Sequence, residues 1–179
     1  MSNNITVHII YASTGGNTEH VMEQISKYWH ANGIEIVFHR AENTPISVIN
    51  DNQYFLLSTS TWDHGTINPF FDKLLSEIKT TDLTGKVAAF VGLGDRRYEK
   101  HYFCTGMLTL KEAWEKSNAK SIGIALMIGR EPFEERIEQM VRDWADKTLP
   151  LYTQEIVDEE VAQKNAINQQ HQNLEGNSS

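Results

Sequence analysis

Short apolar runs alternate with segments of helical periodicity along most of this sequence, and this alternation restricts the possible folds more than any other feature. The apolar runs, each with the length of a buried strand, are Ile5–Tyr11, Ile34–Phe38, Tyr54–Leu57, Val87–Val91 and Ile122–Ile128. The helical segments between and after them are Thr18–His30, Ile46–Ile49, Pro69–Ile78, Met107–Lys116 and Pro132–Leu149. Parallel strands need crossover connections, and these are right-handed. The pattern therefore predicts an α/β fold: a doubly wound parallel sheet of five strands with helices on both faces.

The length and composition predict one folded domain followed by a polar tail. The chain has 179 residues, which is enough for a sizeable core without disulfides. Residues 1–149 contain every predicted strand and helix, so we assign the domain to them. Residues 150–179 are rich in Gln, Asn and acidic residues and poor in large apolar ones, which predicts a disordered acidic tail. We expect that removing the residues after Tyr152 leaves folding intact.

Several classes of function and location are disfavoured by the composition. The formal net charge is -8, and no clustered basic face for nucleic acid is visible. No apolar run approaches the ~20 residues that a membrane span requires. Cys104 is the only cysteine and the first residues lack a secretory leader, so we expect a reducing cytoplasm. The histidines fall on different predicted elements without ligand spacing, so no metal site is predicted.

The loop after the first predicted strand has the composition of an anion-binding turn. It reads "ASTGGNTE" from Ala12 to Glu19, and a helix begins within it. Two glycines allow the backbone to approach a ligand, the hydroxyls can donate hydrogen bonds, and the amides and dipole of the helix N-terminus attract an anion. The loop is neither a P-loop nor a G-x-G-x-x-G turn. Taken alone, a tight turn with a helix cap explains it equally well.

Two further loops place an aromatic residue after a predicted strand. Trp62 follows the third strand in "STSTWDHGTINPF", and Tyr98 follows the fourth in "VGLGDRRYEKHYFCTGM". Ligands of open α/β sheets bind beyond the carboxyl ends of the strands. Each aromatic by itself could simply cover the edge of the core. Together with the first loop they describe a phosphate tether and two flat platforms for a planar ring.

These three loops resemble, in order and spacing, the "T/S-x-T-G-x-T", "STW" and "GD-x-x-Y" loops of the flavodoxin family. The resemblance covers about residues 4–149. It implies the strand order 2-1-3-4-5 and FMN as the cofactor. It also implies a monomeric, low-potential electron-transfer protein that shuttles single electrons between a reductase and redox enzymes, and not an enzyme. The fifth strand lacks a dividing loop, as in short-chain members. Two alternatives stay open: an FMN-dependent NAD(P)H:quinone reductase-like enzyme, and an FMN-independent scaffold on the same fold.

The resemblance also implies which residues contact FMN. Ser13, Thr18, Ser60 and the backbone amides of residues 14–18 would bind the phosphate, and Trp62 and Tyr98 would stack on the flavin ring. The implied cofactor-binding residues are Ser13, Thr14, Gly15, Gly16, Asn17, Thr18, Ser60, Thr61, Trp62, Asp63, His64, Gly65, Gly94, Asp95, Tyr98, Phe103 and Cys104. No catalytic residue is implied. From its apolar surroundings we also expect Cys104 to be a packed residue at a helix start and not a nucleophile.

This chain departs from the family pattern at several of these positions. Gly15 stands where the family has its second hydroxyl, so one phosphate hydrogen bond is lost. Asp63 follows Trp62 where many members have Gly, so a positive φ there would be more costly. Arg96 and Arg97 follow Asp95 where small or polar residues are usual. We therefore expect the surroundings of the flavin to be less negative than is usual in the family.

Overall fold

A parallel β-sheet forms the centre of the protein. The structure is a computed structural model of the 179-residue chain, and it describes residues 5–94, 100–129 and 132–176. The four long strands are β1 (Thr6–Ala12), β2 (Glu35–Arg40), β3 (Tyr54–Ser60) and β4 (Val87–Leu93). They lie in the order β2-β1-β3-β4, and the short strands β5 (Lys120–Ser121) and β6 (Leu126–Ile128) both pair with β4. The predicted order 2-1-3-4-5 and the doubly wound fold are confirmed.

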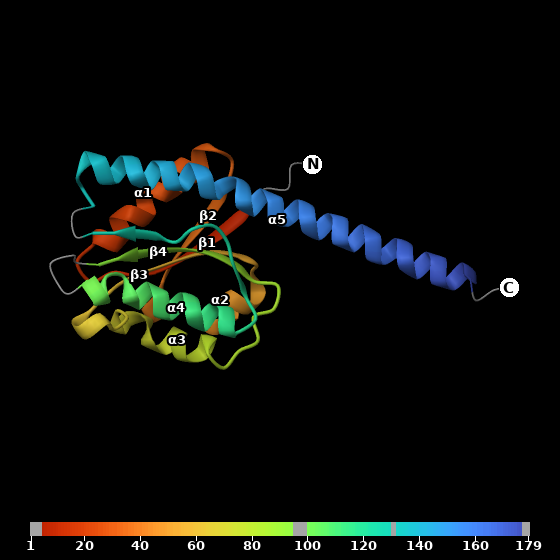
Figure 1. Cartoon of the computed structure of the whole chain (residues 1–179), viewed down its shortest axis with the longest axis horizontal. Helices are drawn as coiled ribbons and strands as arrows, with labels where there is room; N and C mark the ends of the chain where they lie inside the picture. The colour runs from red at the N-terminus through yellow and green to blue at the C-terminus, as the bar shows by residue number, and fades with distance from the viewer. Residues whose placement is uncertain (1–4, 95–99, 130–131, 177–179) are drawn as a thin grey trace.

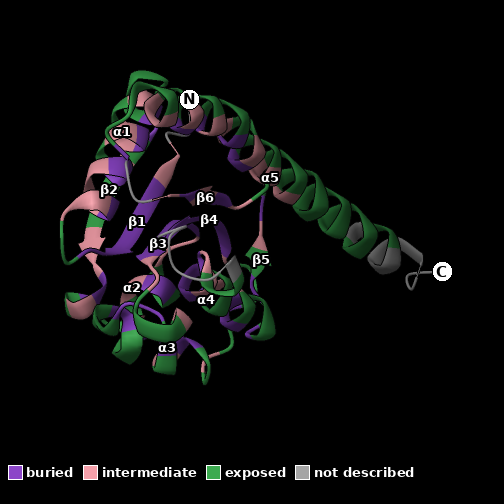
Figure 2. Ribbon diagram, turned by 60° about the vertical axis from the view of Figure 1, so that its left-hand side comes forward, coloured by how far each residue is buried: buried purple, intermediate pink, exposed green. Residues whose placement is uncertain are grey.

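Helices cover both faces of this sheet, as Figure 1 shows. One face carries α1 (Asn17–Ala31) and the first part of α5 (Glu135–Gly176). The other carries α2 (Ile46–Asp51), α3 (Asp72–Ile78) and α4 (Thr105–Lys116). The predicted helix over residues 69–78 is split, because a 3-10 turn at Pro69–Phe71 precedes α3. Each face has its own apolar core, and the burial colours of Figure 2 place the most buried residues on the central strands.

The fifth strand position differs from the single run predicted from the sequence. Ile122 still pairs with the sheet, since its N–H donates to the Ala88 carbonyl oxygen over 2.9 Å. The backbone then leaves the sheet at Gly123, whose φ is 66°. The next carbonyl, of Ile124, accepts a hydrogen bond from the Trp144 indole N–H over 2.7 Å. Residues 123–125 thus lie away from β4, with Ile124 bonded to α5, and separate β5 from β6.

The second strand is an edge strand and is not buried as its apolar run predicted. Val37 is 39% exposed and Phe38 is 41% exposed. Strand β2 pairs only with β1, and so its outer edge is free of other strands in the described part of the sheet. The apolar residues of a short run indicate a strand, but they do not decide whether that strand is central or at an edge.

Helix α5 continues far beyond the predicted end of the domain. Its assigned range runs to Gly176, and Figure 1 shows its second half projecting away from the sheet. We expected disorder after residue 149 because few residues there can join a core. Helix formation does not need a core of its own once a docked helix has nucleated, and the sequence after Tyr152 is rich in Glu, Gln, Ala and Lys, which favour helices.

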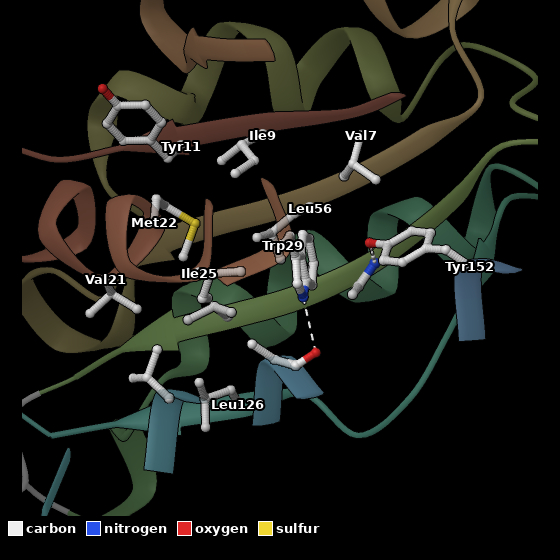
Figure 3. Close-up of a cluster of buried hydrophobic side chains, with 14 of the residues drawn as sticks. Val7, Ile9, Tyr11, Val21, Met22, Ile25, Trp29, Leu56, Leu126 and Tyr152 are labelled. Atoms are coloured by element: carbon white, nitrogen blue, oxygen red, sulfur yellow. Dashed lines mark hydrogen bonds between the residues drawn. The ribbon is translucent and has the colours of Figure 1, made fainter. Parts of the chain in front are cut away.

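The core also extends past the predicted boundary. Tyr152 is completely buried, and its hydroxyl donates to the Phe55 carbonyl oxygen and accepts from the Ala89 N–H. Figure 3 shows this tyrosine beside Trp29, whose indole N–H donates to the Ala145 carbonyl oxygen over 2.9 Å. The division of the chain at residue 149 stays a prediction, but the apolar contacts of α5 continue across it. Among the described residues, none of the helices is both long and apolar enough to cross a membrane.

Candidate functional site

A pocket of about 310 Å³ lies at the carboxyl ends of β1, β3 and β4. Its lining residues are Ser13, Thr14, Gly15, Asn17, Thr18, Ser60, Thr61, Trp62, Leu93, Gly94 and Gly129. All except Leu93 and Gly129 are among the residues predicted from the sequence. The three loops are far apart in the chain, and the parallel sheet brings them together because all of its strands end at the same edge.

The first loop ends in a helix N-terminus that opens onto the pocket. Gly16 is the N-cap residue of α1, and its carbonyl oxygen accepts the first helical bond from the His20 N–H over 2.9 Å. The Gly16 N–H donates to the Ser13 hydroxyl oxygen over 3.1 Å, which closes the loop into a tight turn. The amides of the first helical turn and the helix dipole favour an anion at this end.

An asparagine that the sequence analysis did not select joins the first loop to the end of β3. Asn68 is completely buried, and its side-chain NH₂ donates to the Thr14 hydroxyl oxygen and to the Ser60 hydroxyl oxygen, each over 3.0 Å. The signal in the sequence was the Asn-Pro pair, since Asn68 is the N-cap of the turn that starts at Pro69. That pair predicts a cap, but it does not reveal the contact with Thr14.

An arginine at the end of β2 holds the first loop from the other side. The Arg40 guanidinium donates to the Ser13 carbonyl oxygen over 2.9 Å. It also pairs with Glu42 over 2.9 Å and lies 3.5 Å from Glu19, while the Tyr11 ring lies 5.6 Å below it. Burial, followed by a hydrogen bond to Glu19, raises the pKa of Tyr11 to about 12. This network fixes the start of the loop and leaves two carboxylates close to the one guanidinium.

Trp62 presents an apolar face at the pocket. The residue lines the pocket and is 42% exposed, which leaves enough of the indole uncovered for a flat group to stack on it. Its backbone holds a tight turn, because the Trp62 N–H donates to the Thr66 carbonyl oxygen over 2.8 Å and the Trp62 carbonyl accepts from the Gly65 N–H over 3.0 Å.

The strained residue of this turn is not the one expected. His64 has a φ of 51°, in the left-handed region, and Gly65 follows with a φ of 84°. Asp63 is not among the residues with positive φ, so the conformational cost of a positive φ in a non-glycine residue, expected at Asp63, is found at His64. Asp63 and His64 are exposed, and neither they nor Gly65 line the pocket. Their backbone contacts with a flavin ring stay a prediction.

The third loop leaves β4 through a glycine that allows a close approach of backbone. A Cβ atom on Gly94 would lie 2.8 Å from the Cys104 backbone nitrogen, so a larger residue would push α4 away from the sheet. Cys104 is completely buried as the N-cap of α4, as predicted, and its thiol donates to the Gly92 carbonyl oxygen over 3.3 Å. Phe103 packs against the apolar core on the α4 face. Neither Phe103 nor Cys104 lines the pocket, and Gly16 does not either.

The second predicted platform falls outside the described residues. Asp95, Arg96, Arg97 and Tyr98 all belong to the segment 95–99, which the structure does not describe. The stacking of Tyr98 and the position of the two arginines relative to the pocket therefore stay predictions from the sequence.

The model of the family described as flavodoxin matches residues 9–144. The chain belongs to the flavodoxin family. Its members are FMN-binding electron carriers. A flavodoxin from Maridesulfovibrio salexigens is 30% identical to this flavodoxin over 142 residues, which cover 78% of this chain and 96% of the relative.

Solved flavodoxin structures have the same fold as this flavodoxin. A short-chain flavodoxin associated with a non-canonical PDU bacterial microcompartment superposes with a TM-score of 0.74 at 24% identity, covering 82% of this chain and 98% of its own. A flavodoxin from Fusobacterium nucleatum, bound to flavin mononucleotide, gives a TM-score of 0.65 at 20% identity and covers 79% of this chain and 95% of its own.

The described residues fit the two chemical parts of FMN. A phosphate needs hydrogen-bond donors and a positive potential, which the hydroxyls of Ser13 and Thr14 and the N-terminus of α1 can supply. An aromatic ring needs a flat apolar surface, which Trp62 supplies in the lining of the same pocket. When bound, FMN supplies the electron-transfer chemistry, and the protein supplies binding and electrostatics.

Proposed function

We propose that this flavodoxin holds FMN in the pocket beyond β1, β3 and β4 and carries single electrons between a reductase and redox enzymes. FMN as the cofactor is supported by the family and by the neighbour from Fusobacterium nucleatum that has flavin mononucleotide bound. The observation that carries the proposal is the convergence of a hydroxyl-rich loop, a helix N-terminus and Trp62 on one pocket.

Each part of the pocket then has a separate task. The first loop binds the phosphate through its hydroxyls and through the amides that open α1, and Thr18, a buried residue of the pocket lining, is proposed to join them. Trp62 stacks on the ring and excludes water from one side of it, and Tyr98 is proposed for the opposite side. The turn Asp63–Gly65 is proposed to present backbone groups to the heteroatoms of the ring.

The proposed partners are proteins that meet the exposed edge of the ring. A carrier needs its redox group near the surface, and Trp62, which lines this pocket, is 42% exposed. We propose that the protein acts as a monomer, and that a reductase and acceptor enzymes approach this edge in turn. The only cysteine is buried, and a reducing cytoplasm is the proposed location.

A redox titration of the purified protein tests this function. The protein is expected to be yellow, to release FMN on denaturation, and to take up electrons one at a time when its flavin absorbance is followed during reduction. Electron transfer from a separate flavodoxin reductase should be fast. Steady consumption of NADPH with a quinone, in the absence of any added reductase, would instead assign a quinone reductase activity. A colourless protein without affinity for FMN would contradict both functions.

A further inference from the structure

The buried side chain of Asn68 has an orientation that its neighbours determine. Its Oδ1 accepts a hydrogen bond from the Phe70 backbone N–H over 3.0 Å. A backbone N–H can only donate, so the atom that it meets must be the amide oxygen and the other must be the NH₂ group. Both hydrogens of this NH₂ group are used, one on the Thr14 hydroxyl oxygen and one on the Ser60 hydroxyl oxygen.

This orientation decides what the two hydroxyl groups can do. Each hydroxyl oxygen accepts a hydrogen bond from Asn68, so its own hydrogen is free to be donated to a third group. Within the described part of the chain, neither hydroxyl donates to another protein group, and both residues line the pocket. The Ser13 hydroxyl oxygen is likewise an acceptor, from the Gly16 N–H. Each of these three hydroxyl groups thus has one lone pair already used and its hydrogen available to a ligand in the pocket.

We propose that Asn68 is a positioning residue that occupies one lone pair on each of the Thr14 and Ser60 hydroxyls, directs their hydrogens toward the ligand and so favours a phosphate dianion. The inference rests on the proposed function, because it takes the ligand to be FMN. A phosphate dianion has only acceptors to offer and matches such a site. The hydroxyl end of riboflavin, which lacks the phosphate, is a neutral acceptor and forms weaker hydrogen bonds with such donors. Asn68 therefore determines how strongly the protein prefers FMN over riboflavin.

The substitution Asn68→Asp tests the proposal with almost no change of shape. One carboxylate oxygen still accepts from the Phe70 N–H, while the other replaces the NH₂ group and accepts from the Thr14 and Ser60 hydroxyls. Both hydroxyl hydrogens are then turned away from the pocket, and a negative charge is added. We expect the Kd for FMN to rise by about 10- to 100-fold and the Kd for riboflavin to change by less than about threefold.

The matched control is Asn52→Asp, which makes the same chemical change at the opposite edge of the sheet. Asn52 precedes β3, whereas Ser60 ends it. The Asn52 NH₂ group donates to the Val48 carbonyl oxygen, and the side chain also forms a hydrogen bond with His8, which does not line the pocket. Both Kd values should stay within about twofold of those of the unsubstituted protein. The Kd values are measured by quenching of flavin fluorescence, and circular dichroism checks the fold.

A second comparison decides the question if Asn68→Asp does not fold. The effect of Ser60→Ala on the Kd for FMN is measured twice, once in the unsubstituted protein and once in the Asn68→Ala variant. If Asn68 acts through the Ser60 hydroxyl, the effect of Ser60→Ala on the Kd for FMN is smaller in the second background. Additive effects, an unchanged Kd for FMN, or equal losses for FMN and riboflavin would each overturn the proposal. If the unsubstituted protein binds neither flavin, the proposed function fails, and the role of Asn68 fails with it.

Discussion

Truncation of α5 at two points separates its packed part from its projecting part. We expect removal of residues 164–179 to leave the free energy of unfolding nearly unchanged, and removal of residues 153–179 to lower it. The reason is the distribution of contacts. Among the side chains that the structure describes, none beyond Gln163 forms a hydrogen bond or an ion pair with the domain, and residues 164–170 are exposed, as the green part of α5 in Figure 2 shows.

The size of the loss follows from the contacts of residues 155–159. The Glu159 carboxylate accepts from the Gln53 side-chain amide over 2.5 Å and from the Tyr54 hydroxyl over 3.3 Å, which contributes about 1 to 2 kcal/mol. Glu155 pairs with Lys120 over 2.6 Å, at the protein surface, for up to ~1 kcal/mol. Partial burial of Ile156 against the core adds about 1 kcal/mol. We expect a loss of about 2 to 4 kcal/mol, less the entropy regained by the freed residues.

Urea denaturation followed by circular dichroism measures this loss, with Glu159→Ala and Glu160→Ala as a matched pair. Glu160 is the exposed neighbour of Glu159, so its substitution should change the free energy of unfolding by less than about 0.5 kcal/mol. FMN affinity should be the same in all variants, because the pocket lies at the opposite ends of the strands. Equal stability of the two truncated proteins would refute this reasoning and support the sequence-based expectation that residues after Tyr152 are dispensable.

Three further predictions concern the pocket and the sheet. Trp62→Ala should weaken FMN binding by about 0.5 to 1.5 kcal/mol beyond the lost apolar contact, and an unchanged Kd with unchanged fluorescence quenching would exclude stacking. His64→Gly should be more stable to urea than Asp63→Gly by about 1 kcal/mol, since only His64 has a positive φ; the reverse order would contradict the turn geometry. Burial lowers the pKa of His8 and of His39 below the usual value of 6.5, and the nearby His39 lowers that of His8 further. The folded state therefore favours the neutral imidazoles. The stability that they contribute is complete above about pH 6.5 and is lost as the pH falls below it. The free energy of unfolding, measured with urea at several pH values, should therefore vary less with pH in His8→Phe than in the unsubstituted protein, by at most about 1.4 kcal/mol per pH unit. Identical pH profiles of the two proteins would contradict this prediction.

The sequence by itself determined the features that depend on local patterns. Period and composition located the strands, because a buried parallel strand needs a continuous apolar run wherever it lies in the sheet. The loops "ASTGGNTE" and "STSTW" carry their chemistry in consecutive residues, so most of the pocket lining could be named from the sequence. Their family resemblance and the strand order followed from the same motifs.

Only the tertiary structure decided which distant residues meet. Asn68 and Thr14 are 54 positions apart in the chain, and no local sequence pattern predicts the hydrogen bond between their side chains. The exposure of Phe38 depends on the position of its strand at an edge, and the exit of residues 123–125 from the sheet is accompanied by a contact with Trp144. In the sequence, Tyr152 stands at the start of a polar tail. In the structure, the docking of α5 places it against β3 and β4. In each case the deciding interaction joins segments far apart in the chain, and chain folding, not local preference, brings them within reach.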